Sequence, residues 1–196
     1  MTPKQPTVVV LGGINGAGKT TSSQALLADQ LAVMCFVNAD TIARGLNAIR
    51  PESVALSAGK IMLTRLRELV VDRADFAFET TLSGKTYLPF LRSLRENGYI
   101  VELYYFWLRS ADLAVSRVRA RVRRGGHDIP EATVRQRYQR SLTNFWTGYR
   151  READAWYLYD NSDESTVLVA AGHRGAEPTI GDMTSWATFL EVLGHA

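Results

Sequence analysis

The chain has 196 residues, of which 46% are hydrophobic and 22% are charged, and its formal net charge at pH 7 is +3. This is the composition of an ordinary globular domain, and the single cysteine, Cys35, excludes an internal disulfide. No apolar stretch approaches the ~20 residues of a membrane-spanning helix, and the first residues lack the charged start and apolar middle of a signal peptide. We therefore expect one domain over residues 1–196 in the cytoplasm, away from membranes, with Cys35 in the core.

Strand-like and helix-like patterns alternate along the chain, which predicts an α/β fold with a mainly parallel sheet. The predicted strands are residues 7–11, 33–37, 76–78, 100–107, 156–159 and 166–170. The predicted helices are residues 20–31, 53–72, 85–96, 111–124, 131–149 and 185–193. Apolar residues recur at three- and four-residue spacing in the helix 53–72, and Asn97-Gly98 is a good end for the helix 85–96.

The first predicted strand runs into the segment GINGAGKT, which fits the pattern G-x-x-x-x-G-K-[ST] at every fixed position. Between a strand and a helix, such a loop points successive backbone N–H groups into one concavity, where they hold phosphate oxygens. Lys19 is expected to place its ammonium between the β- and γ-phosphates, and Thr20 to join the Mg²⁺ shell. The expected phosphate-binding residues are Gly13, Ile14, Asn15, Gly16, Ala17, Gly18, Lys19, Thr20 and Thr21.

The P-loop alone does not choose among motor ATPases, GTPases and small-molecule kinases. The sequence has no NKxD-like segment that would read guanine. It also has no apolar strand ending in the aspartate that a motor ATPase would use, because the nearest equivalent, residues 76–79, ends in a single glutamate. These observations favour a kinase.

Two carboxylates stand at the ends of predicted strands, where the loops of a parallel sheet line the ligand crevice. Asp40 follows the second strand and is the candidate that accepts a hydrogen bond from the attacking hydroxyl. Glu79 ends the third strand and is expected to bind the acceptor or a magnesium-bound water. Thr80, Thr81 and Ser83 add hydroxyls for a polar substrate.

Simpler roles are also open for both carboxylates. Asp40 is a good N-cap for a helix that starts near Thr41, which is a common use of aspartate. Glu79 would then be a charge at a strand terminus. The sequence by itself leaves these alternatives standing beside the catalytic ones.

Residues 109–151 contain eleven arginines, no lysine and three acids, a local excess of +8, so the rest of the chain is net acidic at −5. The spacing predicts one helix face with Arg117, Arg121 and Arg124, and a second with Arg137 and Arg140. Two such helices joined by a glycine-rich turn predict a lid, at about residues 117–140, that closes over a triphosphate and excludes water. The arginines on other helix faces are Arg119 and Arg123, expected in solvent, and Arg135.

A nucleic-acid-binding patch is the alternative reading of the arginine-rich segment. The absence of lysine in this segment and its near-neutral surroundings count against that reading. We expect the lid, and no nucleic acid among the partners.

Six segments resemble those of the zeta-toxin-like kinases, in particular the short, stand-alone chromosomal members. They occur in the same order over roughly residues 7–162, and residues from 163 on carry no recognisable motif. The segments are GGINGAGKT at 12–20, NADTIARGL at 38–46, FETTLSG at 78–84, GGHDIP at 125–130, RYQRS at 137–141 and YDNS at 159–162.

The resemblance implies a three-layer P-loop kinase fold, related to nucleotide and shikimate kinases, with an arginine-rich helical lid. Characterised zeta toxins use ATP and Mg²⁺ to phosphorylate the 3′-hydroxyl of the sugar in UDP-N-acetylglucosamine. For this chain the resemblance therefore implies ATP and Mg²⁺ as cofactors, a nucleotide sugar as the acceptor, and an antitoxin protein as a partner to consider.

The matching positions define the site that we expect. The expected catalytic residues are Lys19, Asp40, Arg121 and Arg137. The expected nucleotide contacts outside the P-loop are Arg117, Arg124 and Arg140. The expected acceptor contacts are Asp40, Arg44, Glu79, Thr80 and Ser83, and the expected metal contact is Thr20. A nucleotide-switched module that binds RNA or protein through the arginine-rich segment stays as the competing hypothesis.

Overall fold

One seven-stranded sheet runs through the structure, a computed structural model that describes residues 5–26, 28, 34–126 and 128–194. The strand order is β2-β3-β1-β4-β5-β6-β7. Strands β1 to β5 are parallel, whereas β6 pairs antiparallel with both β5 and β7. This confirms the predicted, mainly parallel α/β sheet. The bounds are β1 Thr7–Gly13, β2 Cys35–Asn38, β3 Phe76–Thr80, β4 Ile100–Trp107, β5 Ala155–Asp160, β6 Val167–His173 and β7 Thr179–Ile180.

Strands β1 and β4 form the middle of the sheet and are its most apolar segments. Val8, Val9 and Val10 of β1 are fully buried, as is Phe106 of β4. A parallel strand that is covered on both faces needs no alternating polar positions, which explains the apolar runs at residues 8–11 and 103–107. The register places Gly13 beside Phe106, so β1 opens into the P-loop at the carboxyl edge of the sheet.

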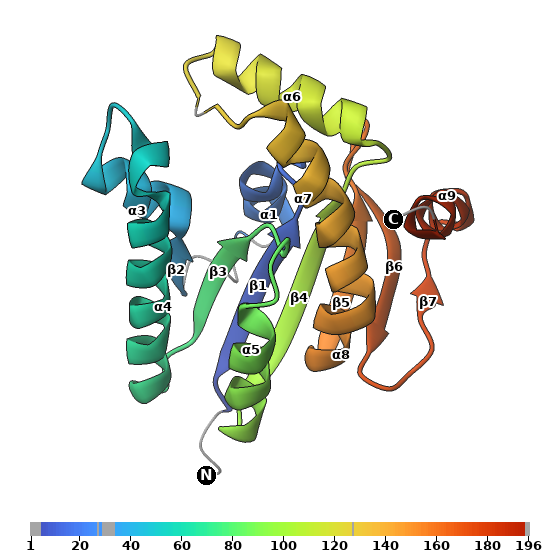
Figure 1. Cartoon of the computed structure of the whole chain (residues 1–196). Helices are drawn as coiled ribbons and strands as arrows, with labels where there is room; N and C mark the ends of the chain where they lie inside the picture. Colours follow the sequence, from blue (N-terminus) through green and yellow to red (C-terminus); the bar gives the residue numbers. More distant parts are fainter. Residues whose placement is uncertain (1–4, 27, 29–33, 127, 195–196) are drawn as a thin grey trace.

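Helices flank the sheet on both sides of its middle strands (Figure 1). In this view α5 and α7 lie in front of the sheet, while α6 crosses above its carboxyl edge. The bounds are α1 Lys19–Leu26, α3 Ala39–Leu46, α4 Ala55–Val71, α5 Tyr87–Glu96, α6 Ala111–Arg123, α7 Glu131–Asn144, α8 Arg150–Glu152 and α9 Met183–Gly194, with a 3₁₀ turn at Pro51–Val54 and a π-helical turn at Phe145–Tyr149.

Several elements differ from the sequence-based expectation. The helix predicted for residues 131–149 is α-helical only as far as Asn144 and continues as the π-helical turn. Helix α3 and strand β7 were not among the predicted elements, and α3 begins two residues before Thr41. The predicted helix 20–31 is present as α1, and its residues 27 and 29–31 lie outside the described residues, as does residue 33 of the strand predicted for 33–37.

The C-terminal helix α9 completes the hydrophobic core with aromatic side chains. The Phe189 ring centroid lies 5.3 Å from that of Trp107, and the two rings are nearly perpendicular. The ring centroids of Trp186 and Phe189 lie 5.5 and 5.7 Å from that of Trp146. Offset and edge-on aromatic pairs of this kind are favourable beyond the area they bury. The segment 163–194, which shows no motif, therefore contributes side chains such as Phe189 to the hydrophobic core.

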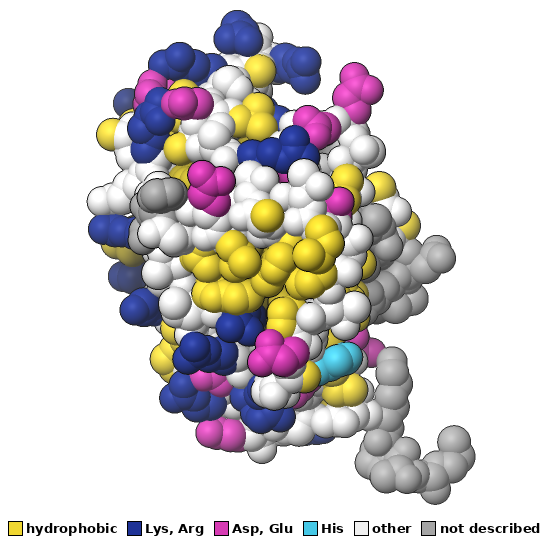
Figure 2. Space-filling model, turned by 90° about the vertical axis from the view of Figure 1, so that its right-hand side faces the viewer, with side chains coloured by type: hydrophobic (Ala, Val, Ile, Leu, Met, Phe, Trp, Pro, Cys, Tyr) yellow, Lys and Arg dark blue, Asp and Glu magenta, His cyan; other side chains and the backbone are white. Residues whose placement is uncertain are grey.

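Exposed hydrophobic side chains gather on the face that β6, β7 and α9 form (Figure 2). Those on these elements are Leu168, Met183 and Leu190, with exposed fractions of 40%, 70% and 40%. Small apolar patches are common on monomeric proteins. Cys35, a free cysteine that the sequence analysis expected in the core, is half-buried on β2 and packs against the edge of the core. In the part of the chain that the structure describes, every helix is too short or too polar to cross a membrane.

Candidate active site

The P-loop joins β1 to α1, and three of its glycines adopt backbone angles that other residues rarely take. The φ angles of Gly13, Gly16 and Gly18 are +143°, +82° and +70°. An added Cβ at Gly13 would collide with the carbonyl oxygen of Phe106, and at Gly18 it would lie 2.8 Å from Nδ2 of Asn161. The glycines are thus required by the conformation of the loop and by the strands packed against it, in addition to any bound anion.

Lys19 and Thr20 converge on Glu79, which lies at the end of β3. The Lys19 side chain is 8% exposed, and its ammonium donates to the Ile14 carbonyl at 3.2 Å and lies 3.6 Å from Glu79 Oε1. The Thr20 hydroxyl donates to Glu79 Oε2 at 2.7 Å. A hydroxyl beside a carboxylate is the hard-oxygen donor set that suits Mg²⁺, and a buried ammonium suits a phosphate. The residues present therefore fit ATP with Mg²⁺.

The side chain of Asn38 links this carboxylate to helix α3. Its Nδ2 donates to Glu79 Oε2 at 3.1 Å, while its Oδ1 accepts from the backbone N–H groups of Asp40 at 2.8 Å and Thr41 at 3.3 Å. Asn38 is therefore the N-cap of α3, so the alternative that Asp40 caps this helix is wrong. Glu79 is also more than a charge at a strand terminus, because it binds three side chains.

Asp40 lies in the first turn of α3 with its side chain exposed. Together with Arg44 it lines a small hollow of about 80 Å³ between α3 and the start of α4. The predicted acceptor contacts are thus divided between two places, since Asp40 and Arg44 lie on α3 whereas the Glu79 carboxylate bonds to the P-loop. Asn38 is the residue that joins the two places.

The loop that follows β3 contains the other predicted acceptor contacts. The Thr80 hydroxyl oxygen accepts from the backbone N–H of Leu82 at 3.2 Å, and the hydroxyl oxygens of Thr81 and Ser83 lie 2.8 Å apart. All three hydroxyl-bearing residues are half-buried. They lie at the carboxyl edge of the sheet, next in sequence to Glu79.

A polar cavity of about 830 Å³ lies over the P-loop and beneath the carboxyl-terminal half of α6. The predicted arginines Arg117, Arg121 and Arg124 line it. Arg137 and Arg140 are not among the described residues that line the cavity, so the structure does not bring these two predicted residues into the nucleotide site. The other residues that line it are Gly16, Gly18, Lys19, Thr20, Thr21, Ser22, Ala25, Glu79, Ala120, Gly126, Asn161, Asp163, Glu164 and Thr166.

Arg117 is bonded within the chain to the loop that follows β5. Its two terminal nitrogens donate to the backbone carbonyls of Asn161 at 2.6 Å and Ser162 at 2.7 Å. Asn161 in turn donates to the carbonyl of Ala17 in the P-loop at 2.6 Å. The structure shows that Asn161 supports the P-loop, a role for which the sequence offers no signal.

Several other arginines of the arginine-rich segment also have partners within the chain. Arg119 and Arg135 both bind Glu131, and Arg135 also binds Asp112, so these pairs join α6 to α7. Arg119 is exposed, as expected, and forms its ion pair with Glu131 at the surface. Arg109 binds the buried Asp160 at 2.7 Å, and the guanidinium of Arg150 lies 3.8 Å from the ring centroid of Trp146. The segment is thus not one continuous basic face.

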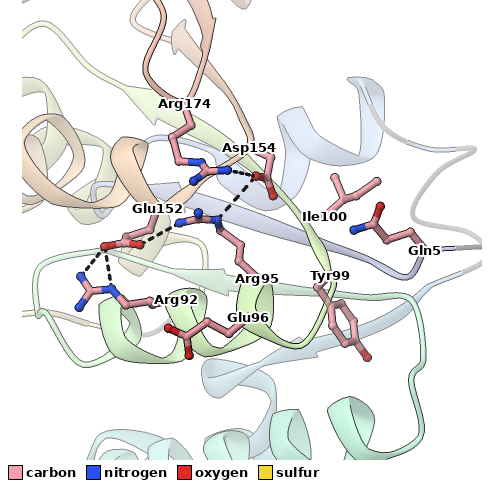
Figure 3. Close-up of a pocket in the computed structure, with 9 residues that line it drawn as sticks. All are labelled: Gln5, Arg92, Arg95, Glu96, Tyr99, Ile100, Glu152, Asp154 and Arg174. Atoms are coloured by element: carbon pink, nitrogen blue, oxygen red, sulfur yellow. Dashed lines mark hydrogen bonds and ion pairs between the residues drawn. The ribbon is translucent and has the colours of Figure 1, made fainter.

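A second polar cavity, of about 660 Å³, lies at the amino ends of the strands, at the opposite edge of the sheet from the P-loop (Figure 3). Its arginines are bound by carboxylates. Glu152 binds Arg92 at 2.5 Å and Arg95 at 3.2 Å, while Asp154 lies 3.6 Å from Arg95 and 3.4 Å from Arg174. These ion pairs connect α5, α8 and the ends of β5 and β6, and indicate a structural role.

Residues 8–143, more than half of the chain, match the profile of a family described as AAA domain (AAA_33). The chain belongs to this family. A relative from Haemophilus influenzae (strain ATCC 51907 / DSM 11121 / KW20 / Rd), described as an uncharacterized protein, is 32% identical over 126 residues, which are 64% of this chain and 88% of the relative. The AAA_33 match covers the P-loop, both strand-end carboxylates and the lid helix α6.

Three solved structures share the fold at low sequence identity. A chain of the AvrRxo1-ORF1:ORF2 complex with ATP has a TM-score of 0.72 at 19% identity, with 95% of this chain and 64% of that chain covered. A chain of the PezAT chromosomal toxin–antitoxin system of Streptococcus pneumoniae has a TM-score of 0.62 at 17% identity, covering 85% and 72%. A gluconokinase from Sinorhizobium meliloti 1021 has a TM-score of 0.50 at 16% identity, covering 81% and 84%.

These likenesses show a P-loop kinase-like fold. At identities under 20% they do not extend to the acceptor, and this chain spans only 64% of the length of the AvrRxo1 chain that it matches.

Proposed function

We propose that this chain is a kinase that transfers the γ-phosphoryl group of ATP, bound with Mg²⁺, to a hydroxyl group of a small acceptor. The observation that carries the proposal is the convergence of Lys19 and Thr20 on Glu79, at a polar cavity that arginines of α6 line. The kinase-like fold of the neighbours, one of which was crystallised with ATP, supports it.

The P-loop residues would hold the nucleotide. Bound ATP and Mg²⁺ supply the transferable phosphoryl group and offset its charge. The Lys19 ammonium, now paired with Glu79, would turn to the β- and γ-phosphates, while the Thr20 hydroxyl and the Glu79 carboxylate stay on the metal side. Arg121 and Arg124, which line the cavity, would neutralise charge that develops on the phosphoryl group.

The acceptor hydroxyl would approach from the α3 side, where Asp40 accepts a hydrogen bond from it and holds it in line. Asn38 supports this arrangement, because it binds Glu79 and caps the helix that carries Asp40. Arg137 and Arg140 lie on α7, outside the cavity lining, and would take part only after the lid has closed. The proposed acceptor contacts remain Asp40, Arg44, Glu79, Thr80 and Ser83.

For the acceptor we propose a nucleotide sugar, with UDP-N-acetylglucosamine as the first candidate. The resemblance of the six segments to zeta-toxin-like kinases and the likeness to a PezAT chain support this choice. The AvrRxo1 structure is a complex of two proteins, and PezAT is a toxin–antitoxin system, so we also propose an antitoxin-like protein partner.

The competing hypothesis, a nucleotide-switched module that binds RNA or protein, has less support. It requires a free basic surface, whereas Arg117, Arg119 and Arg135 are bonded to groups of this chain. An electrophoretic shift of RNA with a steep salt dependence would favour it over the kinase.

The proposal is tested by incubating the chain with ATP, Mg²⁺ and a panel of UDP-sugars, followed by mass spectrometry for an added phosphate. A phosphorylated sugar nucleotide is the expected product. A protein that binds ATP but phosphorylates none of the sugars would reject the nucleotide-sugar acceptor, and failure with a wider panel of small alcohols would reject the kinase itself.

A further inference from the structure

The loop at residues 81–84, directly after Glu79 and Thr80, has a backbone conformation that is unfavourable without support from the rest of the structure. Leu82 adopts a φ angle of +55°, in the left-handed region that bulky residues avoid. Its side chain is 1% exposed and packs on the bare backbone of Gly12, where an added Cβ would lie 2.6 Å from Leu82 Cδ1. Such strain persists only where the surroundings enforce it, and it is typical of functional sites.

Three buried side chains on one helix enforce this conformation by binding the carbonyls of the loop. The Ser141 hydroxyl donates to the Thr81 carbonyl at 2.5 Å, the Asn144 amide donates to the Leu82 carbonyl at 2.9 Å, and the Tyr149 hydroxyl donates to the Gly84 carbonyl at 2.6 Å. Their exposed fractions are 0%, 7% and 0%. Because the Ser141 proton is used by Thr81, the adjacent Tyr105 hydroxyl, at 2.8 Å, donates to Ser141.

The π-helical turn Phe145–Tyr149 makes this row of donors possible. Residues three or four apart share a face of an α-helix, so Ser141 and Asn144 do, but a residue five positions after Asn144 would point away. A π-helical turn holds an extra residue, which returns Tyr149 to the face that meets the loop. Single π-helical turns inside α-helices are frequent at functional sites.

We propose that Ser141, Asn144 and Tyr149 are positioning residues that hold residues 81–84 in the conformation in which Thr80 and Ser83 meet the acceptor. The proposal rests on the proposed function. Arg140 and Arg137 lie on the same helix, about one and two turns before Asn144. Helix α7 therefore fixes the acceptor loop and these lid arginines relative to each other. The row acts on the acceptor side, and among the described residues none of its three members lines the cavity over the P-loop.

Tyr149→Phe is the test variant, because it removes one hydroxyl and keeps the ring. Tyr138→Phe is its matched control, since Tyr138 is a buried tyrosine on the same helix whose hydroxyl donates to the carbonyl of Leu108, outside the loop, at 2.8 Å. Asn144→Ala, which removes the donor to the Leu82 carbonyl itself, is the second variant.

Two readouts are compared in the full chain. With ATP present, backbone hydrogen exchange of the segment 81–86 should be about tenfold faster in Tyr149→Phe than in the parent protein. In Tyr138→Phe it should proceed at the parental rate. With UDP-N-acetylglucosamine as the acceptor, kcat/KM for the sugar should fall about tenfold while KM for ATP stays at the parental value.

Parental exchange of this segment in both Tyr149→Phe and Asn144→Ala would overturn the proposal, as would an equal effect of Tyr138→Phe or an equal rise of both KM values. Failure of the proposed function has a different signature, because it appears in the parent protein as absence of phosphoryl transfer. Failure of the positioning role appears only in the variants.

Discussion

The side-chain amide of Asn161 donates a hydrogen bond of 2.6 Å to the backbone carbonyl of Ala17, across 144 positions of the sequence. Asn161 is 9% exposed, its Oδ1 accepts from Thr166 at 2.7 Å, and its own carbonyl accepts from Arg117. The buried side-chain amide of Asn161 therefore holds the P-loop at Ala17, and the backbone carbonyl of the same residue holds Arg117 in the middle of the lid helix. The shape of the phosphate site depends on the loop after β5 as much as on the glycines.

Replacing this amide should weaken nucleotide binding. Asn161→Ala leaves the Ala17 carbonyl without its donor and Thr166 without its Oδ1 acceptor, while the backbone carbonyl that binds Arg117 stays in place, so the Kd for ATP should rise about tenfold. Titration calorimetry with ATP measures the change. Asn97→Ala is the control, because Asn97 also donates to a backbone carbonyl, that of Ser93, but at the end of α5. Equal Kd values for Asn161→Ala and the parent would contradict the anchoring role.

Glu79→Gln should separate metal use from nucleotide binding. The amide keeps the size of the side chain, but it cannot neutralise Mg²⁺ and no longer pairs with Lys19. We expect turnover to fall about 10²-fold and the Mg²⁺ concentration for half-maximal rate to rise, while metal-free ATP binds at least as tightly as before. Rates measured across a Mg²⁺ series, with Asp163→Asn from the same cavity as the control, check this. An unchanged Mg²⁺ profile would place Glu79 elsewhere in the reaction.

Asp40→Asn tests the orientation of the acceptor hydroxyl. Loss of a general base lowers turnover by ~10²–10⁴-fold, and because Asp40 lies outside the P-loop, the Kd for ATP should stay nearly constant. The helix should remain intact, since Asn38 and not Asp40 caps it. Initial rates and ATP binding are measured on the same preparation. A variant that phosphorylates at the parental rate would remove Asp40 from the mechanism.

The lid arginines can be ranked by their position in the structure. Arg121 lines the nucleotide cavity, whereas Arg119, two residues earlier, is bound by Glu131 on the outer side of the lid. Arg121→Ala should lower kcat about 10²–10³-fold, as the loss of a preorganised charge does, and Arg119→Ala should change it less than about twofold. Steady-state kinetics on both variants gives the two kcat values. A similar loss of kcat in both would contradict this ranking and show that the whole lid acts as one unit.

Alkaline pH should unfold the protein through its buried tyrosines. Burial raises the pKa of Tyr138 to about 12, above its ordinary value of 10.0. A pKa that is higher in the folded state gives stability that is full below pH 10 and is lost as the pH rises towards 12. Each such tyrosine contributes a slope of about 1.4 kcal/mol per pH unit in that window. Denaturant unfolding between pH 9 and 12 should therefore give a flatter profile for Tyr138→Phe, and a profile parallel to that of the parent would disprove the shift.

The parts of the fold that follow from local pattern could be predicted from the sequence. The P-loop has fixed spacing, and β4 is apolar except at Glu102, so both were found close to their true bounds. Helix α3 was not predicted as an element because its main signal is a single capping residue, Asn38, which also fits a turn. The π-helical turn has no sequence pattern of its own, because it is set by the contact of Tyr149 with a distant loop.

The candidate site was predictable to the extent that its residues stand next to each other in the chain or at strand ends. Lys19, Thr20 and Glu79 lie together because parallel strands bring their carboxyl ends to one edge, where the sequence placed both the P-loop and Glu79. The partners of the arginines were not predictable, because helical spacing shows which residues share a face and not what that face meets. Arg117 therefore looked like a phosphate ligand, although it bonds to two carbonyls.

The ion pairs at the edge of the sheet opposite the P-loop (Figure 3) lie apart from the residues of the proposed reaction. Thermal stability and catalysis therefore depend on different residues of this protein. Glu152 and Asp154 form ion pairs with Arg92 and Arg95 of α5 and with Arg174 after β6, and none of these residues lines the nucleotide cavity. The contribution of ion-pair networks to protein stability increases as temperature rises. Substitutions at that edge, in relatives or in engineered variants, can therefore change the thermal stability. The rate of the reaction depends on residues at the opposite edge and can be selected separately.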